Sequence, residues 1–276
     1  MKPMARTLNK DTQLCISLAA RPSNLGTRFH NFLYEELDLN FVYKAFAPVN
    51  LANAIAGIRG LPIRGAAVSM PYKEECIQYL DELDPSAKVI ASVNTIVNSE
   101  GHLKAYNTDY LAIASLLASH QVDPNDDFVV LGSGGMAKAV VAALHDAGFE
   151  AGTVVARNSA AGSAIAEQYG YGWQAEIASL RPSLLINATP IGMAGGSGEG
   201  QMAAPETVVG GASTIFDVVA FPSETPLIHA GRAADKVVIT GAEVIALQAA
   251  EQFELYTGVR PTPDQVRRAS EFSQAQ

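Results

Sequence analysis

Short apolar runs alternate with amphipathic segments along almost the whole chain, and this alternation most constrains the fold. The apolar runs have the length of buried strands, and the segments between them carry apolar residues at helical spacing. Strands separated by helices form right-handed βαβ units, so the pattern predicts an α/β fold with largely parallel sheets. The predicted strands are 14–18, 41–46, 66–70, 128–131, 153–156, 184–187, 214–218 and 237–239, and the predicted helices lie near 27–37, 51–58, 72–80, 110–119 and 137–147.

The chain is long enough for two domains, and its pattern changes near Asp109. Its 276 residues exceed the roughly 150 residues of an ordinary domain. A hairpin-like pair of strands, 93–97 and 102–106, precedes Asp109, and a helix and a fresh strand follow it. We therefore predict one domain over 1–109 and a second over 110–241. The helical pattern at 242–256 ends at Gly258, a residue type that suits a helix C-terminus.

The composition excludes several classes of protein. Hydrophobic residues make up 48% of the chain and charged residues 17%, which excludes a mainly disordered protein. The formal charge of −9 argues against a nucleic-acid partner. No stretch approaches the roughly 18 apolar residues that a membrane span needs, so we expect no membrane partner. Cys15 and Cys76 make no disulfide framework and favour a reducing cytoplasm, and the histidines show no metal-site spacing.

A glycine-rich turn between a predicted strand and a predicted helix is the strongest local motif. Gly132, Gly134 and Ala137 fill the G-x-G-x-x-A spacing, with Ser133, Gly135 and Met136 between them. The first glycine permits a tight turn, the second lets the backbone approach a pyrophosphate, and the alanine allows close packing of helix and strand. The helix N-terminus then offers N–H groups to the phosphates. The alternative is a plain tight turn without a ligand.

The next predicted strand favours NADP over NAD. NAD sites place a carboxylate near the end of this strand to hold the ribose 2′-hydroxyl. Here the strand runs into Arg157, Asn158 and Ser159, with no carboxylate at that place. The guanidinium of Arg157 can pair with a 2′-phosphate in two parallel hydrogen bonds. The alternative is that Arg157 is a solvated turn residue.

Three polar residues stand at the edges of elements in the N-terminal half. Lys73 follows a buried strand and Pro71, Asn94 lies in Ser-Val-Asn-Thr, and Asp109 lies in Asn-Thr-Asp. A lysine can take the proton of an alcohol as a hydride leaves its carbon. Spacing alone favours a surface lysine at position 73 and a helix cap at Asp109 over a catalytic pair.

The ordered set of these motifs resembles the shikimate dehydrogenase family. The motifs are V-S-M-P-Y-K-E, S-V-N-T, N-T-D, G-S-G-G-M-A, A-R-N, I-N-A-T-P-I-G-M and a late helix with Gln248, and they extend from Cys15 to Gly258. The resemblance implies an N-terminal α/β substrate domain and a Rossmann-type NADP-binding domain with a cleft between them. It also implies that a C-terminal helix, 242–276, packs back on the substrate domain. The expected assembly is a monomer or a homodimer.

The resemblance also implies roles for individual residues. Lys73 matches the catalytic lysine, and Asp109 matches the aspartate that pairs with it. Ser69, Asn94 and Gln248 match substrate-binding positions. Cofactor contacts are expected from the glycine loop, from Arg157 and Asn158 at the 2′-phosphate, from Thr189 in the loop 187–193 beside the nicotinamide ribose, and from Gly241.

The sequence departs from the family where the substrate carboxylate is held. The family's H-S-x-S-P motif is broken, and Ser23, Thr27 and Arg28 remain in that region. Ala67 replaces an asparagine, and Ala220 stands where a tyrosine is expected. The chain is thus similar to the shikimate dehydrogenase-like subgroup. We predict an NADP-dependent oxidoreductase of a hydroxylated ring acid, with weak or altered activity on shikimate. The alternatives are an NAD-dependent quinate/shikimate dehydrogenase and a catalytically weak NADP-binding or sensing protein.

Overall fold

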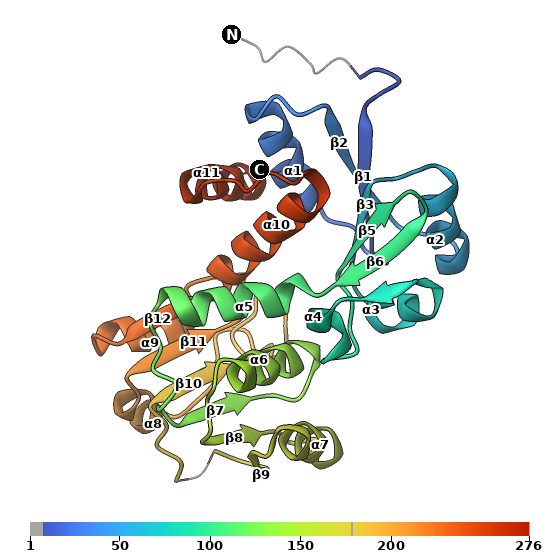
Figure 1. Ribbon diagram of the computed structural model, residues 1–276. Helices are drawn as coiled ribbons and strands as arrows, with labels where there is room; N and C mark the ends of the chain where they lie inside the picture. The colour runs from blue at the N-terminus through green and yellow to red at the C-terminus, as the bar shows by residue number, and fades with distance from the viewer. Residues whose placement is uncertain (1–7, 178, 276) are drawn as a thin grey trace. The chain divides into compact units, whose positions relative to one another are not determined.

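The chain forms two compact units, each with its own sheet. The computed structural model describes residues 8–177 and 179–275. Unit 1 comprises the chain up to Thr108 together with Ala246 onward, and unit 2 comprises Asp109–Ile245. Figure 1 labels most of the strands and helices of both units.

Unit 1 is built on a mixed six-stranded sheet in the order β2-β1-β3-β5-β6-β4. Strand β1 pairs in parallel with β2 and β3, whereas β5 runs antiparallel to both β3 and β6. The antiparallel pair is the hairpin that the sequence predicts. The strands are β1 (Gln13–Leu18), β2 (Phe41–Phe46), β3 (Gly65–Val68), β4 (Glu82–Leu83), β5 (Thr95–Ser99) and β6 (His102–Tyr106).

Helices α1 (Leu25–Glu36) and α2 (Leu51–Gly60) connect the parallel strands of unit 1 and carry apolar residues into two cores. Leu51, Ile55 and Ile58 of α2 are buried in one core, and Phe29 and Leu33 of α1 in the other. The segment predicted as one helix near 72–80 is α3 (Tyr72–Glu75) followed by the 3-10 turn η1 (Cys76–Tyr79), and α4 (Pro85–Lys88) precedes β5.

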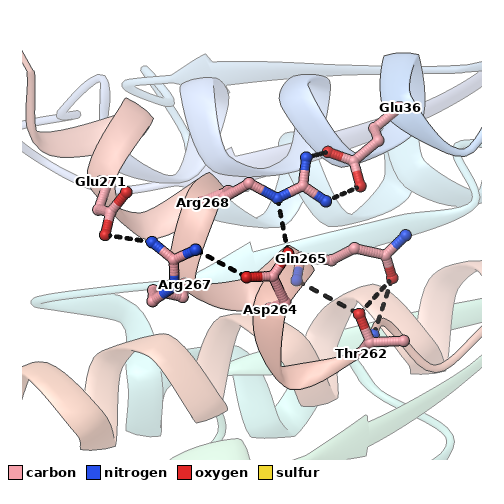
Figure 2. Close-up of polar contacts among 7 residues, drawn as sticks. All are labelled: Glu36, Thr262, Asp264, Gln265, Arg267, Arg268 and Glu271. Atoms are coloured by element: carbon pink, nitrogen blue, oxygen red, sulfur yellow. Dashed lines mark hydrogen bonds and ion pairs between the residues drawn. The ribbon is translucent and has the colours of Figure 1, made fainter.

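Two helices, rather than one, form the C-terminal region. They are α10 (Gly241–Thr257) and α11 (Pro263–Gln274), and α11 lies beside α1 (Figure 1). Thr262 and Gln265 form a capping box at the start of α11. Figure 2 shows Arg268 of α11 paired with Glu36 of α1, with Nη1 2.7 Å from Oε2. Exposed ion pairs contribute little, so the burial of Val266 and Ala269 holds α11 in place.

Unit 2 is a fully parallel six-stranded sheet in the order β12-β11-β10-β7-β8-β9. This is the strand order of a doubly wound dinucleotide-binding fold, with the order reversing at β7. The strands are β7 (Phe128–Leu131), β8 (Gly152–Val155), β9 (Gly172–Gln174), β10 (Leu184–Asn187), β11 (Thr214–Asp217) and β12 (Val237–Thr240). The helices are α5 (Thr108–Ser119), α6 (Gly135–Asp146), α7 (Ser159–Tyr169), α8 (Glu206–Gly211) and α9 (Pro226–Ala233).

Every residue of β7, β10 and β11 is buried. Parallel sheets are covered by helices on both faces, so their strands are continuously apolar and not alternating. This burial explains why the apolar runs of the sequence identify these strands. No described helix is long and apolar enough to span a membrane.

Candidate active site

Lys73 lies in the first turn of α3, directly beyond the carboxyl end of β3. Two main-chain hydrogen bonds hold the connection. Ser69 N donates to Leu18 O at 2.9 Å, and Val93 N donates to Lys73 O at 2.9 Å. Lys73 is half-buried and Ser69 is exposed. The backbone of Lys73 is therefore tied to Val93, the residue before Asn94.

Asn94 has one half of its amide fully paired and the other half unpaired. Its Oδ1 accepts from Thr95 Oγ1 at 2.9 Å, from Thr108 N at 2.8 Å and from Thr108 Oγ1 at 3.1 Å. The side chain is 1% exposed, yet Nδ2 has no hydrogen-bond partner among the described residues. Buried N–H groups are almost always paired. The amide nitrogen of Asn94 is thus a donor that a ligand oxygen would satisfy.

The late helix α10 brings two glutamines to unit 1. Gln248 is half-buried, and Gln252 follows one turn later on the same face. Gln252 is 4% exposed and donates from Nε2 to Thr95 Oγ1 at 3.0 Å and to Asn94 O at 3.3 Å. The sequence motifs single out Gln248 but not Gln252. Its spacing of four residues from Gln248 is the signal that could have identified it.

The altered carboxylate-binding region lies at the start of α1. Ser23 is exposed, and Thr27 is half-buried in the first turn of the helix. The Arg28 guanidinium carbon lies 4.7 Å from the centre of the Phe272 ring of α11. The loop between β1 and α1 lies beside the loop between β3 and α3, because Ala20 N donates to Met70 O at 3.2 Å.

Asp109 is 6% exposed and lies in the first turn of α5. A carboxylate there is favoured by the positive end of the helix dipole. Asp109 is the first residue of unit 2, whereas Lys73 belongs to unit 1. The pairing of these two side chains stays a prediction.

The glycine loop of unit 2 takes the form that a dinucleotide site needs. Gly132 has φ +115°, and a Cβ there would lie 2.9 Å from Ala188 O, so a side chain is excluded. Gly134 is the N-cap of α6 without a side-chain cap, and a Cβ on Gly134 or Gly135 would meet nothing within 4 Å. Ala137 is fully buried. The open glycines and the uncapped N–H groups therefore leave room for a diphosphate, with Ser133 and Met136 half-buried in the same turn.

Arg157 and Asn158 connect β8 to α7. Arg157 is exposed, and no carboxylate lies between Val155 and Ser159. The Asn158 Oδ1 accepts from Ala161 N at 3.1 Å and so caps α7. Asn158 therefore organises the helix start, and Arg157 supplies the cation that a 2′-phosphate would need.

A buried carboxylate organises the loop that contains Thr189. Asp217 accepts from Thr225 Oγ1 at 2.7 Å, from Val219 N at 3.0 Å and from Asn187 Nδ2 at 3.0 Å. Asn187 Oδ1 in turn accepts from Thr189 Oγ1 at 2.6 Å. Burial raises the pKa of Asp217 to about 6. These bonds fix the loop after β10 to the end of β11.

Gly241 is buried against the backbone of Val219, which leaves no space for a Cβ. Packing alone thus explains this glycine, and its role at the cofactor stays a prediction. In the parts of the chain that the structure describes, no group of three His, Cys, Asp or Glu side chains is placed to hold a metal ion.

Comparison with known proteins identifies the family. Residues 23–96 match the family model described as the shikimate dehydrogenase substrate binding domain. The chain is 52% identical over 266 residues to a shikimate dehydrogenase-like protein of Haemophilus influenzae, covering 96% of this chain and 98% of that protein. The chain belongs to the shikimate dehydrogenase family.

Two further comparisons place this chain within that family. A shikimate dehydrogenase (NADP(+)) of Dehalococcoides mccartyi is 35% identical over 249 residues, covering 85% of this chain and 86% of that protein. A solved structure of a shikimate 5-dehydrogenase-like protein superposes with a TM-score of 0.96 at 51% identity, covering 98% of this chain and 100% of that one. The resemblance to the shikimate dehydrogenase-like subgroup is confirmed.

Proposed function

We propose that the protein is an NADP-dependent oxidoreductase that transfers a hydride reversibly between NADP(H) and a hydroxylated ring acid, shikimate or a relative. The observation that carries the proposal is the unpaired, buried amide nitrogen of Asn94, which follows Val93, the residue whose N–H donates to Lys73 O. A site built to donate a hydrogen bond recognises a ligand oxygen and rejects ligands that lack one. A hydroxylated ring supplies such an oxygen.

Unit 2 is the cofactor domain in this proposal. The uncapped start of α6 binds the diphosphate, and Arg157 pairs with the 2′-phosphate that distinguishes NADP from NAD. Thr189 and its loop, fixed by Asn187 and Asp217, border the nicotinamide ribose. Bound NADP accepts a hydride at its nicotinamide ring.

Lys73 carries the proton chemistry in this proposal, with Asp109 as its expected partner. Lys73 takes the proton of the substrate hydroxyl during oxidation and returns it during reduction, and Asp109 holds the Lys73 ammonium. Asn94, Ser69 and Gln248 hold the ring hydroxyls. Asn94 is preorganised for this task because three donors fix its Oδ1.

The substrate carboxylate is held differently from the family pattern. The paired serines of that pattern are absent, and Ser23 and Thr27 at the start of α1 are the hydroxyls that remain. Weak turnover of shikimate, or preference for a related ring acid, follows from this change. Cys15 and Cys76 are both buried free thiols, which supports a reducing location such as the cytoplasm.

A panel of shikimate, quinate and other hydroxylated ring acids tests the proposal. Oxidation is followed by the absorbance of the reduced cofactor, with NADP+ and NAD+ compared at equal concentrations. We expect turnover of at least one ring acid and a preference for NADP+. A folded protein that binds NADP+ but oxidises none of the ring acids would instead be an NADP-binding or sensing protein. Preference for NAD+ with quinate would instead indicate an NAD-dependent quinate/shikimate dehydrogenase.

A further inference from the structure

A chain of buried polar side chains runs from α10 to Asn94. Gln252 Nε2 donates to Thr95 Oγ1 at 3.0 Å, and Thr95 Oγ1 donates to Asn94 Oδ1 at 2.9 Å. The three side chains are 4%, 0% and 1% exposed, respectively. We propose that Gln252 and Thr95 are positioning residues that orient the Asn94 amide toward the substrate. This inference rests on the proposed function.

The direction of each hydrogen bond in the chain is fixed by chemistry. The amide N–H of Gln252 can only donate, so it occupies a lone pair of the Thr95 hydroxyl. The Thr95 hydroxyl has a single proton, and Asn94 Oδ1 at 2.9 Å is a nearer acceptor for it than Thr108 Oγ1 at 3.4 Å. The same nitrogen of Gln252 also holds the main-chain oxygen of Asn94 at 3.3 Å. Gln252 therefore holds the Asn94 backbone directly and its side chain through Thr95.

The hydrogen bonds to Asn94 Oδ1 determine which end of the Asn94 amide is free. Thr108 N can only donate and lies 2.8 Å from Oδ1, so a flipped amide would place an NH2 group against that N–H and would lose the bond that Thr95 Oγ1 donates to Oδ1. Such an arrangement leaves buried groups unpaired, at a cost comparable to a hydrogen bond for each. The amide is thus locked with Nδ2 as the unpaired donor, in the state that can bind a substrate oxygen.

Helix α10 carries both Gln248, which is expected to bind the substrate, and Gln252, which holds Asn94. Gln248, which the family resemblance assigns to substrate binding, lies one turn earlier on the same face of α10. Gln252 is the more buried of the two and contacts Asn94 and Thr95. We therefore expect Gln248 to act on the substrate and Gln252 to act through Asn94.

Kinetics with shikimate and NADP+ test this inference. Thr95→Val and Gln252→Leu should each lower kcat/KM for shikimate by about tenfold to a hundredfold, mainly through KM, and leave KM for NADP+ unchanged. Thr95→Ser restores the hydroxyl and should recover activity to within about threefold of wild type. Thr257→Val is the matched control. The Thr257 hydroxyl also lies in α10, but it donates to Phe253 O and has no part in the hydrogen bonds among Gln252, Thr95 and Asn94.

A double-mutant cycle separates positioning from general destabilisation. If Thr95 acts through Asn94, Thr95→Val should cost little once Asn94→Ala is present. Additive losses in the double mutant would overturn the inference, as would a Thr95→Val protein with wild-type KM for shikimate. Neither result would contradict the proposed function as long as the wild-type protein turns over a ring acid. Absence of wild-type turnover on every ring acid would overturn both. Monodeoxy analogues of shikimate add a further check, since one of them should be insensitive to Thr95→Val.

Discussion

Replacement of His30 by phenylalanine should make unit 1 more resistant to acid. His30 lies in α1 with no exposed surface, and neither ring nitrogen has a hydrogen-bond partner within the described chain. Its ring stacks on Tyr43 at 4.5 Å between centroids and lies nearly parallel to Phe253. A phenylalanine ring suits these neighbours, so the change removes a titrating group without emptying the site.

The magnitude follows from the two pKa values of the imidazole. Burial lowers the pKa of His30 from its ordinary 6.5 to about 3, and the nearby Gln252 side chain opposes part of the shift. Between these values the unfolded chain takes up a proton that the folded protein does not. Folding stability is therefore lost by about 1.4 kcal/mol per pH unit as the pH falls below about 6.5. From about pH 7 to pH 4.5 the loss is about 2.5 kcal/mol.

Urea denaturation of wild type and variant across this pH range measures the effect. The variant should gain about 2.5 kcal/mol relative to wild type between about pH 7 and pH 4.5. His229→Gln, which removes an exposed imidazole, is the control and should follow wild type. A difference between His30→Phe and wild type that does not change with pH would refute the reasoning, as would a His30 NMR resonance that titrates near 6.5.

Three further predictions concern unit 2. Burial raises the pKa of Asp217 from 3.8 to about 6. Its contribution to folding stability is therefore full below about pH 4 and falls by about 3 kcal/mol as the pH rises through 6. Asp217→Asn should abolish this pH dependence of the unfolding free energy in urea denaturation. Gly132→Ala should destabilise the protein by about 1–3 kcal/mol in thermal denaturation, because of its positive φ and the approach of Ala188 O; Gly134→Ala, which meets open space, should not. Arg157→Ala should raise KM for NADP+ by about tenfold to a hundredfold but leave KM for NAD+ unchanged, and the exposed Arg181→Ala is its control; equal losses for both cofactors would contradict the assigned role.

Continuous apolar runs made most strands predictable from the sequence. β7 and β10 begin and end where predicted, because every residue in them is buried. Helix α7 has no counterpart among the predicted elements, and α11 is predicted only as part of one C-terminal helix over 242–276, since each buries few apolar side chains. Ile165 and Ala166 are the larger buried residues of α7, and Val266 and Ala269 those of α11. Weak periodicity of this kind conceals a helix from sequence reasoning.

Local motifs made part of the site predictable. The glycine turn was predictable because the backbone constraints of Gly132 and Gly134 are local to a strand–turn–helix unit. The contact between Gln252 and Thr95 was not predictable, because the two residues lie 157 positions apart along the chain. The capping bond of Asn158 was also missed, since an asparagine before a helix and a cofactor ligand look alike in sequence.

Turnover by Lys73→Ala tests the central claim most directly, with NADPH affinity measured on the same preparation. A lysine that exchanges the proton of the substrate hydroxyl contributes about 10²–10⁴-fold to the rate. We expect kcat on the best ring acid to fall by about that factor while the dissociation constant for NADPH stays within about twofold of wild type. Lys88→Ala, at the exposed end of α4, should retain wild-type turnover. Wild-type turnover by Lys73→Ala would contradict the account.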